Sequence, residues 1–238
     1  MKWKLKDNIL LEDEHLIVVN KPAGLLSIPD RQQNKSLKDQ LIKEYGEIFV
    51  VHRLDRDTSG VIVFAKTKQA HQELNAAFSS RVVVKKYKAL VCGVVHEEDQ
   101  TVELPIMIVP NQSKSKIDHK SGKASKTEVK VIERFSKYTL VECTLHTGRM
   151  HQIRVHMAAI GHPLMIDPLY GNSEAFYLSQ IVSNYKVSKG KEERPIMDTL
   201  TLHSSFLSFD HPILDKKCSI DATLSKSFQV IIKRLRHV

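Results

Sequence analysis

Long hydrophobic runs are absent from this sequence of 238 residues, although 42% of its residues are hydrophobic. Its longest apolar stretches, residues 60–65 and 89–95, fall far short of the roughly 20 residues that a membrane-spanning helix needs. The basic residues 1–7 are not followed by the apolar region of a secretory signal peptide. We therefore expect no membrane association, no export and a cytoplasmic location.

Cysteine and aromatic residues are also scarce. The three cysteines, Cys92, Cys143 and Cys218, are odd in number and far apart, which argues against a disulfide framework and predicts buried free thiols in a reducing compartment. A chain of this size buries enough apolar surface to need no disulfide or metal for stability. With aromatic content at only 6%, Val, Ile and Leu dominate the apolar segments and favour a core that contains a sheet.

Internal repeats, low-complexity tracts and Pro-, Gly- or Ser-rich linkers are missing too, so we expect residues 1–238 to form a single domain. Apolar periodicity predicts several strands interleaved with a few helices, although it does not name a topology. The strands are expected within residues 8–20 and over 61–65, 85–92, 127–135, 138–146 and 200–209. The helices are expected over 36–45, 68–79, 150–160 and the C-terminal stretch, with 172–194 a polar, irregular segment.

Positive charge is abundant. Thirty-six Lys and Arg residues against 27 Asp and Glu residues give a formal net charge of +9, which attracts polyanions such as nucleic acid, although a generic basic surface would show the same excess. Residues 112–130 contain six lysines and only two acidic residues. This polar segment predicts an exposed basic loop that leads into a strand and contacts phosphates.

Residues 51–60 place a cluster of charged side chains immediately before an apolar strand. Asp55 lies between Arg53 and Arg56, whose charges favour its ionised form. An ionised carboxylate is a competent nucleophile, as in glycosidases that attack an anomeric carbon. The same composition also fits a structural salt-bridge cluster at a turn, and His52 alone fits a hydrogen-bonded structural histidine.

A second polar cluster lies in residues 145–157, where Gly148 permits a tight turn into the following helix. The first turn of a helix presents N–H groups and a positive dipole end to an anion, and we expect Arg149 and His151 in that turn, with Arg154 one turn further on. Three histidines here raise the alternative of a zinc site. Their spacing of five residues places them on different helix faces, and no HExxH or paired cysteine is present, so we predict no metal site.

A third candidate is Tyr87, which lies among the cations of residues 81–90, including Lys85. A tyrosine in this setting could stack on a base or take part in proton transfer. An ordinary strand aromatic is the equally simple alternative.

Taken together and in order, these segments resemble the RluA family of RNA pseudouridine synthases. The matching segments are residues 12–25 (EDEHLIVVNKPAGL), 52–55 (HRLD), 85–93 (KKYKALVCG), 147–156 (TGRMHQIRVH), 161–171 (GHPLMIDPLYG), and 202–203 and 211–212. A lone HRLD motif would be weak support, but the ordered set is specific and covers roughly residues 8–215. Many members carry an additional S4-type RNA-binding domain before this pattern; because the pattern here starts near residue 8, we expect no such domain in this sequence.

The resemblance implies an α+β fold, with a single mixed, mostly antiparallel sheet, flanking helices and a central basic cleft. It implies an isomerase that breaks the N1–C1′ bond of a uridine, turns the uracil and joins C5 to C1′. Asp55 would be the essential carboxylate, whether it attacks C1′, attacks C6 or triggers a glycal route. Tyr87 would stack on the uracil and assist proton removal at C5, Arg154 would pair with Asp55, and Arg53 would fill the space left by the flipped nucleotide.

The expected substrate-binding residues are His52, Arg53, Arg56, Lys85, Arg149 and His151. An isomerisation needs no metal, nucleotide or redox cofactor, and the sequence has no P-loop or G-x-G-x-x-G motif. The expected partner is structured ribosomal or transfer RNA, bound by a monomer without an obligatory protein partner. Two other readings are a non-catalytic RNA-binding protein on the same scaffold and a carboxylate nuclease or glycosidase, for which Asp57 is the only nearby second acid.

Replacing Lys114, Lys116, Lys120 and Lys123 by glutamine should weaken RNA binding and flatten its salt dependence. Each lysine that neutralises a phosphate adds about 0.9 to the slope of log affinity against log salt concentration. Binding titrations at several salt concentrations measure this slope. An unchanged slope would show that the segment does not contact phosphates.

Overall fold

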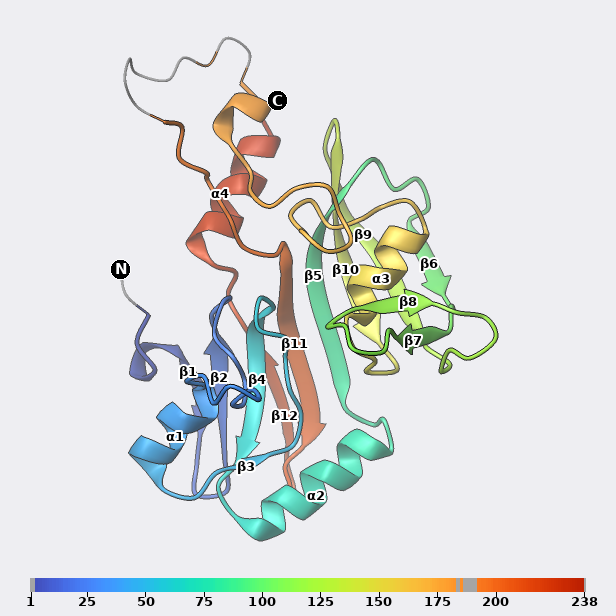
Figure 1. Cartoon of the computed structure of the whole chain (residues 1–238). Helices are drawn as coiled ribbons and strands as arrows, with labels where there is room; N and C mark the ends of the chain where they lie inside the picture. The colour runs from blue at the N-terminus through green and yellow to red at the C-terminus, as the bar shows by residue number, and fades with distance from the viewer. Residues whose placement is uncertain (1–2, 183–184, 186–191, 238) are drawn as a thin grey trace. The chain divides into compact units, whose positions relative to one another are not determined.

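The computed structural model describes residues 3–182, 185 and 192–237, and the chain divides into two compact units (Figure 1). Unit 1 comprises Met1–Tyr87, Thr144–His146 and His203–Thr223, and unit 2 comprises Lys88–Cys143, Thr147–Leu202 and Leu224–Val238. Within the described residues the strands form one ten-stranded sheet and one two-stranded sheet. The predicted α+β class with a mixed, mostly antiparallel sheet is confirmed, whereas the single domain over residues 1–238 stays a prediction.

The centre of unit 1 is a row of paired strands. They run in the order β1 (Ile9–Glu12), β2 (Leu16–Lys21), β4 (Ser59–Ala65) and β11 (Leu202–Asp210), with β3 (Phe49–Val50) also on β4 and β12 (Lys217–Asp221) on β11. All seven residues of β4 are buried, which explains why its sequence is a continuous apolar run without alternation. The pairing of β4 with β11 is parallel, and the other pairings in this row are antiparallel.

Helices α1 (Leu37–Tyr45) and α2 (Lys68–Ser79) begin where the sequence predicts them. Ser36 caps α1, because its side chain accepts the N–H of Asp39 while the Asp39 carboxylate accepts the N–H of Ser36. Thr67 caps α2 in the same way by accepting the N–H of Ala70. A short 3-10 helix, Lys6–Asn8, precedes β1.

The core of unit 1 gathers apolar side chains from strands and from one face of α2. Its buried members are Leu16, Val18, Val61, Val63, Ala65, Ala70, Leu74, Val83, Leu207, Phe209, Cys218, Ile220 and Ala222. Since these residues come from positions 16 to 222, the N-terminal strands and the C-terminal strands depend on each other for burial.

Unit 2 continues from the second half of β5 (Val84–Cys92). Its strands follow the order β5, β10 (Tyr138–Leu145), β9 (Thr127–Arg134) and β6 (Asp99–Val102), with α3 (Gln152–Ala159) and α4 (Lys226–Leu235) as its α-helices. Burial alternates along the first six residues of β9, as expected for a strand with one covered face. Its core collects Leu90, Phe135, Leu140, Met165, Ile166, Phe176, Met197, Phe228, Ile231, Ile232 and Leu235.

The basic segment 112–130 is more ordered than predicted. It contains β8 (Ser115–Ile117), which pairs with β7 (Ile106–Ile108) to form the two-stranded sheet, and its last residues belong to β9. We call residues 106–117 the basic hairpin. Strand β8 packs against α3, beside which it lies in Figure 1. The prediction of a loop was wrong here because strands of three residues leave too short a pattern to read.

The remaining predictions concern the irregular segment 172–194, the cysteines and the absence of a membrane span. The polar segment 172–194 is irregular as predicted apart from a 3-10 helix, Leu178–Gln180, and its residues 183–184 and 186–191 lie outside the described residues. All three cysteines are free thiols, with Cys143 and Cys218 buried and Cys92 partly buried. Across the part of the chain that is described, no helix has the length and apolarity for a membrane span.

Gly60→Ala should lower the free energy of unfolding by about 2 to 3 kcal/mol. Gly60 has a positive φ of 113°, and a Cβ at this position would collide with the backbone carbonyl of Ser204 in the adjoining strand. Urea denaturation measures the loss. Gly161→Ala is the control, since Gly161 also has a positive φ but open space around its Cβ, and it should lose only about 1 kcal/mol. Equal losses would contradict the steric explanation.

Candidate functional site

Asp55 lies in the loop between β3 and β4, in unit 1, and is partly buried between exposed Arg53 and Arg56. The carbonyl of Asp55 accepts the N–H of Thr58 at 3.2 Å, which closes a turn directly before β4. The rigid, fully buried strand that follows therefore holds one end of the loop.

A serine from a distant turn fixes the residue before Asp55. The hydroxyl of Ser27 donates to the carbonyl of Leu54 at 2.7 Å and accepts the N–H of Leu54 at 3.1 Å. Both backbone polar groups of Leu54 are satisfied by one buried side chain. The backbone at Asp55 thus cannot shift without breaking both bonds.

Lys21 fixes the residue after Asp55. Its buried ammonium donates to the carbonyl oxygens of Arg56 at 2.9 Å, Leu25 at 2.7 Å and Pro22 at 3.0 Å, and Gly24 adds an N–H bond of 2.9 Å to the same Arg56 carbonyl. Burial lowers the pKa of Lys21 to about 7, and the negative charges of Asp57 and Asp55 offset part of that shift. The turn 21–27 is therefore a brace for residues 54–56, and we call it the lysine brace.

Tyr87, the last residue of the unit 1 part of β5, is only 8% exposed. Burial raises the pKa of its phenol to about 12; a hydrogen bond with Ser204 lowers it and the negative charge of Asp55 raises it further. Asp55 is thus near enough to Tyr87 to act on it electrostatically. At neutral pH the phenol is uncharged, so its ring can stack and its hydroxyl can donate.

His52 and Lys85 lie deeper than their expected role in binding suggests. The His52 ring stacks on Phe78 at 4.6 Å between centroids, and its Nε2 accepts the N–H of Val63 at 3.1 Å. Burial, followed by the charge of Lys85, lowers the pKa of His52 to about 3, so the ring is neutral. Burial, followed by the charge of Arg81, also lowers the pKa of Lys85. Substrate binding by His52 and Lys85 stays a prediction.

In unit 2, helix α3 begins later than predicted, at Gln152, and His151 is the N-cap residue with a left-handed φ of 58°. The Gln152 side chain explains this start: its Oε1 accepts the N–H of Arg149 at 3.0 Å and the hydroxyl of Thr147 at 2.8 Å. Arg149 therefore lies in the turn before the helix, where its guanidinium donates to the carbonyl of Ala124. The placement of Arg149 and His151 in the first helical turn was wrong.

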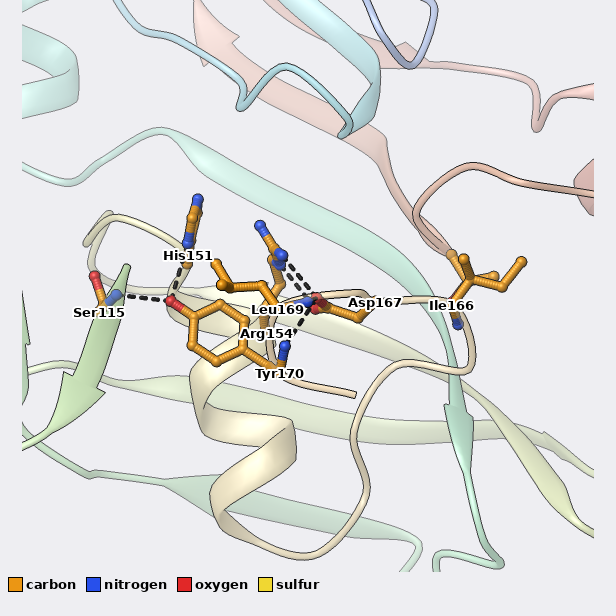
Figure 2. Close-up of polar contacts among 8 residues, drawn as sticks. Ser115, His151, Arg154, Ile166, Asp167, Leu169 and Tyr170 are labelled. Carbon is orange, nitrogen blue, oxygen red and sulfur yellow. Dashed lines mark hydrogen bonds and ion pairs between the residues drawn. The ribbon is translucent and has the colours of Figure 1, made fainter. Parts of the chain in front are cut away.

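Arg154, on α3, forms a buried ion pair with Asp167 (Figure 2). Its Nε donates to Oδ2 at 2.8 Å and its Nη2 to Oδ1 at 2.7 Å, a two-pronged geometry that fixes the plane of the guanidinium. Burial is the largest single influence on the pKa of Asp167 and raises it. The hydrogen bonds and charge of Arg154, together with two backbone N–H groups, outweigh burial and lower this pKa below its usual value. The expected pairing of Arg154 with Asp55 stays a prediction, since the two residues belong to different units.

The alternative of a zinc site gains no support. His151 bonds to the hydroxyl of Tyr170, and both ring nitrogens of His156 are engaged, with Thr127 and with the carbonyl of Leu104. Among the residues that are described, no group of three or more His, Cys, Asp or Glu side chains could hold a metal ion.

Sequence reasoning missed the residues that support the predicted ones. Lys21, Ser27 and Asp167 received no role, although Lys21 and Asp167 stand inside motifs that carried the resemblance. Their contacts with Arg56, Leu54 and Arg154 respectively join positions that lie 13 to 35 residues apart along the chain. A local pattern does not encode such pairings, so the only available signal was a charged residue enclosed by apolar and turn residues.

Comparison with known proteins identifies relatives of this chain. A family model described as RNA pseudouridylate synthase matches residues 15–159. The chain is 40% identical over 213 residues to the dual-specificity RNA pseudouridine synthase RluA of Vibrio parahaemolyticus, a match covering 86% of this chain and 78% of the relative. It is 36% identical over 247 residues to the ribosomal large subunit pseudouridine synthase D of Pseudomonas aeruginosa, covering 99% of this chain and 74% of the relative.

Solved structures give a similar result. The human RNA pseudouridylate synthase domain containing 4 superposes with a TM-score of 0.74 at 26% sequence identity, covering 98% of this chain and 94% of that chain. The human RNA pseudouridylate synthase domain containing 1 superposes with a TM-score of 0.70 at 25% identity, covering 97% and 95%.

Lys21→Met should destabilise the fold by about 2 to 3 kcal/mol, because it leaves three carbonyl groups of the lysine brace without their shared donor. The pKa of Lys21 is about 7 in the folded chain against 10.5 for an ordinary lysine, so between these values the unfolded chain binds more protons. Wild-type stability should therefore gain up to about 1.4 kcal/mol per pH unit from Lys21 as pH rises above 7.

Urea denaturation of both proteins at pH 7, 8 and 9 tests this linkage, because the difference in stability between wild type and Lys21→Met should grow with pH. Lys66→Met is a matched control, since Lys66 is only partly buried and donates to the carbonyl of Asp13 and to Glu12. A constant difference across the three pH values would refute the linkage.

Proposed function

The chain belongs to the RluA family of RNA pseudouridine synthases, and we propose that it isomerises specific uridines of ribosomal or transfer RNA with Asp55 as the catalytic carboxylate. The observation that carries the assignment of Asp55 is its setting. A carboxylate between two exposed arginines stands on a loop that Ser27 and Lys21 brace from both sides, within electrostatic reach of the Tyr87 phenol. A reaction at C1′ needs such a positioned carboxylate.

Tyr87 is proposed as the second catalytic residue. A nearly buried phenol with a pKa of about 12 stays neutral during turnover, so its ring can stack on the uracil. Its hydroxyl would then be placed to assist the proton transfer at C5 that completes the isomerisation. The hydrogen bond with Ser204 would hold the ring in the plane that stacking requires.

Arg154 is proposed as the basic residue of the site, with its guanidinium held by Asp167. Asp167 neutralises the charge of Arg154 within the buried pair, so the part of Arg154 in the reaction would be to orient and donate hydrogen bonds. Arg53, which is exposed, would occupy the space that the flipped nucleotide leaves, and Arg56 and Arg149 would contact the RNA backbone.

The target RNA is proposed from the relatives. RluA enzymes carry the name dual-specificity RNA pseudouridine synthase, and the synthase D proteins are named for the large ribosomal subunit. Both names fit a basic chain that reaches RNA through phosphate contacts, including lysines of the basic hairpin. A cytoplasmic monomer that needs no cofactor completes the proposal.

Asp55→Asn should abolish pseudouridine formation, lowering its rate by at least about 10³-fold, because the amide cannot supply a nucleophilic or charged oxygen. RNA affinity should change only a few-fold, since a carboxylate does not attract a polyanion. Asp57→Asn is the matched control: Asp57 is an exposed acid two residues away, and its variant should retain activity.

The experiment compares cells that lack the gene with the same cells supplied with wild type, Asp55→Asn or Asp57→Asn. Carbodiimide treatment and primer extension on total RNA then locate pseudouridines that depend on each protein. Full activity of Asp55→Asn would remove Asp55 from its catalytic role. Loss of activity in Asp57→Asn would instead favour a mechanism with two acids, and sites found only in other RNA classes would overturn the proposed target.

A further inference from the structure

We infer that Tyr170 is a positioning residue that holds the basic hairpin against the fixed Arg154–Asp167 pair, so that RNA bound at the hairpin is placed correctly relative to the Arg154 side chain. All the residues concerned belong to unit 2. The inference rests on the proposed function, since it assigns the hairpin to the RNA and Arg154 to the reaction.

The hydroxyl of Tyr170 bonds to two separate elements (Figure 2). It accepts the backbone N–H of Ser115, the first residue of β8, at 2.7 Å. It also lies 3.0 Å from Nδ1 of His151, the N-cap residue of α3. Because a backbone N–H can only donate, the Tyr170 oxygen must be the acceptor there, which leaves its own proton for a neutral His151. One oxygen atom therefore ties β8 to the start of α3.

The ring of Tyr170 adds a second connection. The guanidinium carbon of Arg154 lies 4.9 Å from the ring centroid, and Nζ of Lys114 lies 5.7 Å from it. Both distances are in the range of a cation–π interaction. Lys114 immediately precedes β8, so the same ring contacts a cation of the hairpin and the cation of the proposed site.

Tyr170 is itself held in place by the partner of Arg154. Oδ1 of Asp167 accepts the N–H of Tyr170 at 3.1 Å and that of Leu169 at 2.9 Å, while both oxygens of Asp167 bond to Arg154. Gly171 closes the loop by donating to the carbonyl of Asp167 at 2.9 Å. The backbone of Tyr170 is therefore anchored to the Arg154–Asp167 pair, and its side chain extends that anchor to the hairpin.

The hairpin has the charge to respond to RNA. Lys114 and Lys116 lie on or beside β8, and Lys116 forms an exposed ion pair with Asp118 that a phosphate could replace. Ser115, between the two lysines, carries the N–H that bonds to Tyr170. A phosphate drawn to either lysine thus acts on the strand residue next to the link.

Hydrogen exchange tests the link without requiring any RNA. Tyr170→Phe removes one oxygen and keeps the ring, so exchange at the Ser115 amide should accelerate at least about 10-fold, as expected when a hydrogen-bond acceptor is lost. Tyr138→Phe is the control, because Tyr138 packs its ring edge-on against Phe176 in the same unit. Unchanged exchange at Ser115 in Tyr170→Phe overturns the inference.

Kinetics test the consequence for the reaction. Tyr170→Phe should raise KM for the RNA about 5- to 10-fold with kcat nearly unchanged, whereas Tyr170→Leu, which also loses the ring against Arg154, should lower kcat as well. In a background with Lys114→Gln and Lys116→Gln, Tyr170→Phe should have little further effect on KM, because the hairpin no longer binds phosphate. Additive effects, or equal loss of kcat in both Tyr170 variants, overturn the coupling.

Failure of the inference and failure of the proposed function give different results. If the wild-type protein forms no pseudouridine, the function is wrong, while the exchange experiment still decides whether Tyr170 links the two elements. If Tyr170→Phe does not fold, His151→Asn removes the other partner of the hydroxyl, and asparagine tolerates the left-handed φ of that position. That variant should accelerate exchange at the start of α3, and unchanged exchange there overturns the inference.

Discussion

The position of the Asp55 backbone depends on hydrogen bonds from a turn about thirty residues earlier in the chain, the lysine brace. A loop that carries a carboxylate between two arginines has little apolar surface to hold it, so its order must come from polar contacts. Ser27 satisfies the N–H and the carbonyl of Leu54, and Lys21 with Gly24 satisfies the carbonyl of Arg56. Burial of the Lys21 ammonium costs free energy, and hydrogen bonds to three carbonyl oxygens offset that cost.

The buried Arg154–Asp167 pair in unit 2 restrains a side chain, whereas the lysine brace restrains a backbone segment. Arg154 is a long, flexible side chain, and the carboxylate of Asp167 converts it into a fixed group by accepting two parallel hydrogen bonds. Removal of either partner would leave an uncompensated charge in a buried position, which costs about 3 to 5 kcal/mol. Asp167 is therefore as necessary to the arrangement as the arginine, although only the arginine is proposed to act on the substrate.

Sequence reasoning was reliable where structure follows from local chemistry. Ser36 and Thr67 are capping residues that mark the first turns of α1 and α2, and the continuous apolar run of β4 marks a strand buried on both faces. It failed where a single side-chain hydrogen bond sets the end of an element or where an element is too short to show a period. The start of α3 moved because the side chain of Gln152 bonds to Arg149 and Thr147, and the basic hairpin formed from strands too short to show a period.

For the candidate site, the motifs supplied the residue types but not their partners. Asp55, Tyr87 and Arg154 were predicted, and the structure adds what holds each of them: the lysine brace, Ser204 and Asp167. For His52 the sequence allowed both a role in binding, which stays a prediction, and a structural role as a hydrogen-bonded histidine. Its stacking on Phe78 and its bond to the Val63 amide depend on the tertiary fold and are invisible in the sequence.

The way the chain is divided between its two units has a consequence for synthesis on the ribosome. Strand β4 pairs with β11, and His203 lies opposite Ser59, so the sheet of unit 1 stays incomplete until more than 140 further residues have been made. During that interval the backbone edge of β4 that pairs with β11 has no partner strand. The sheet of unit 1 should thus be completed slowly and late during synthesis. Until the C-terminal strands emerge, the nascent chain should need protection from aggregation.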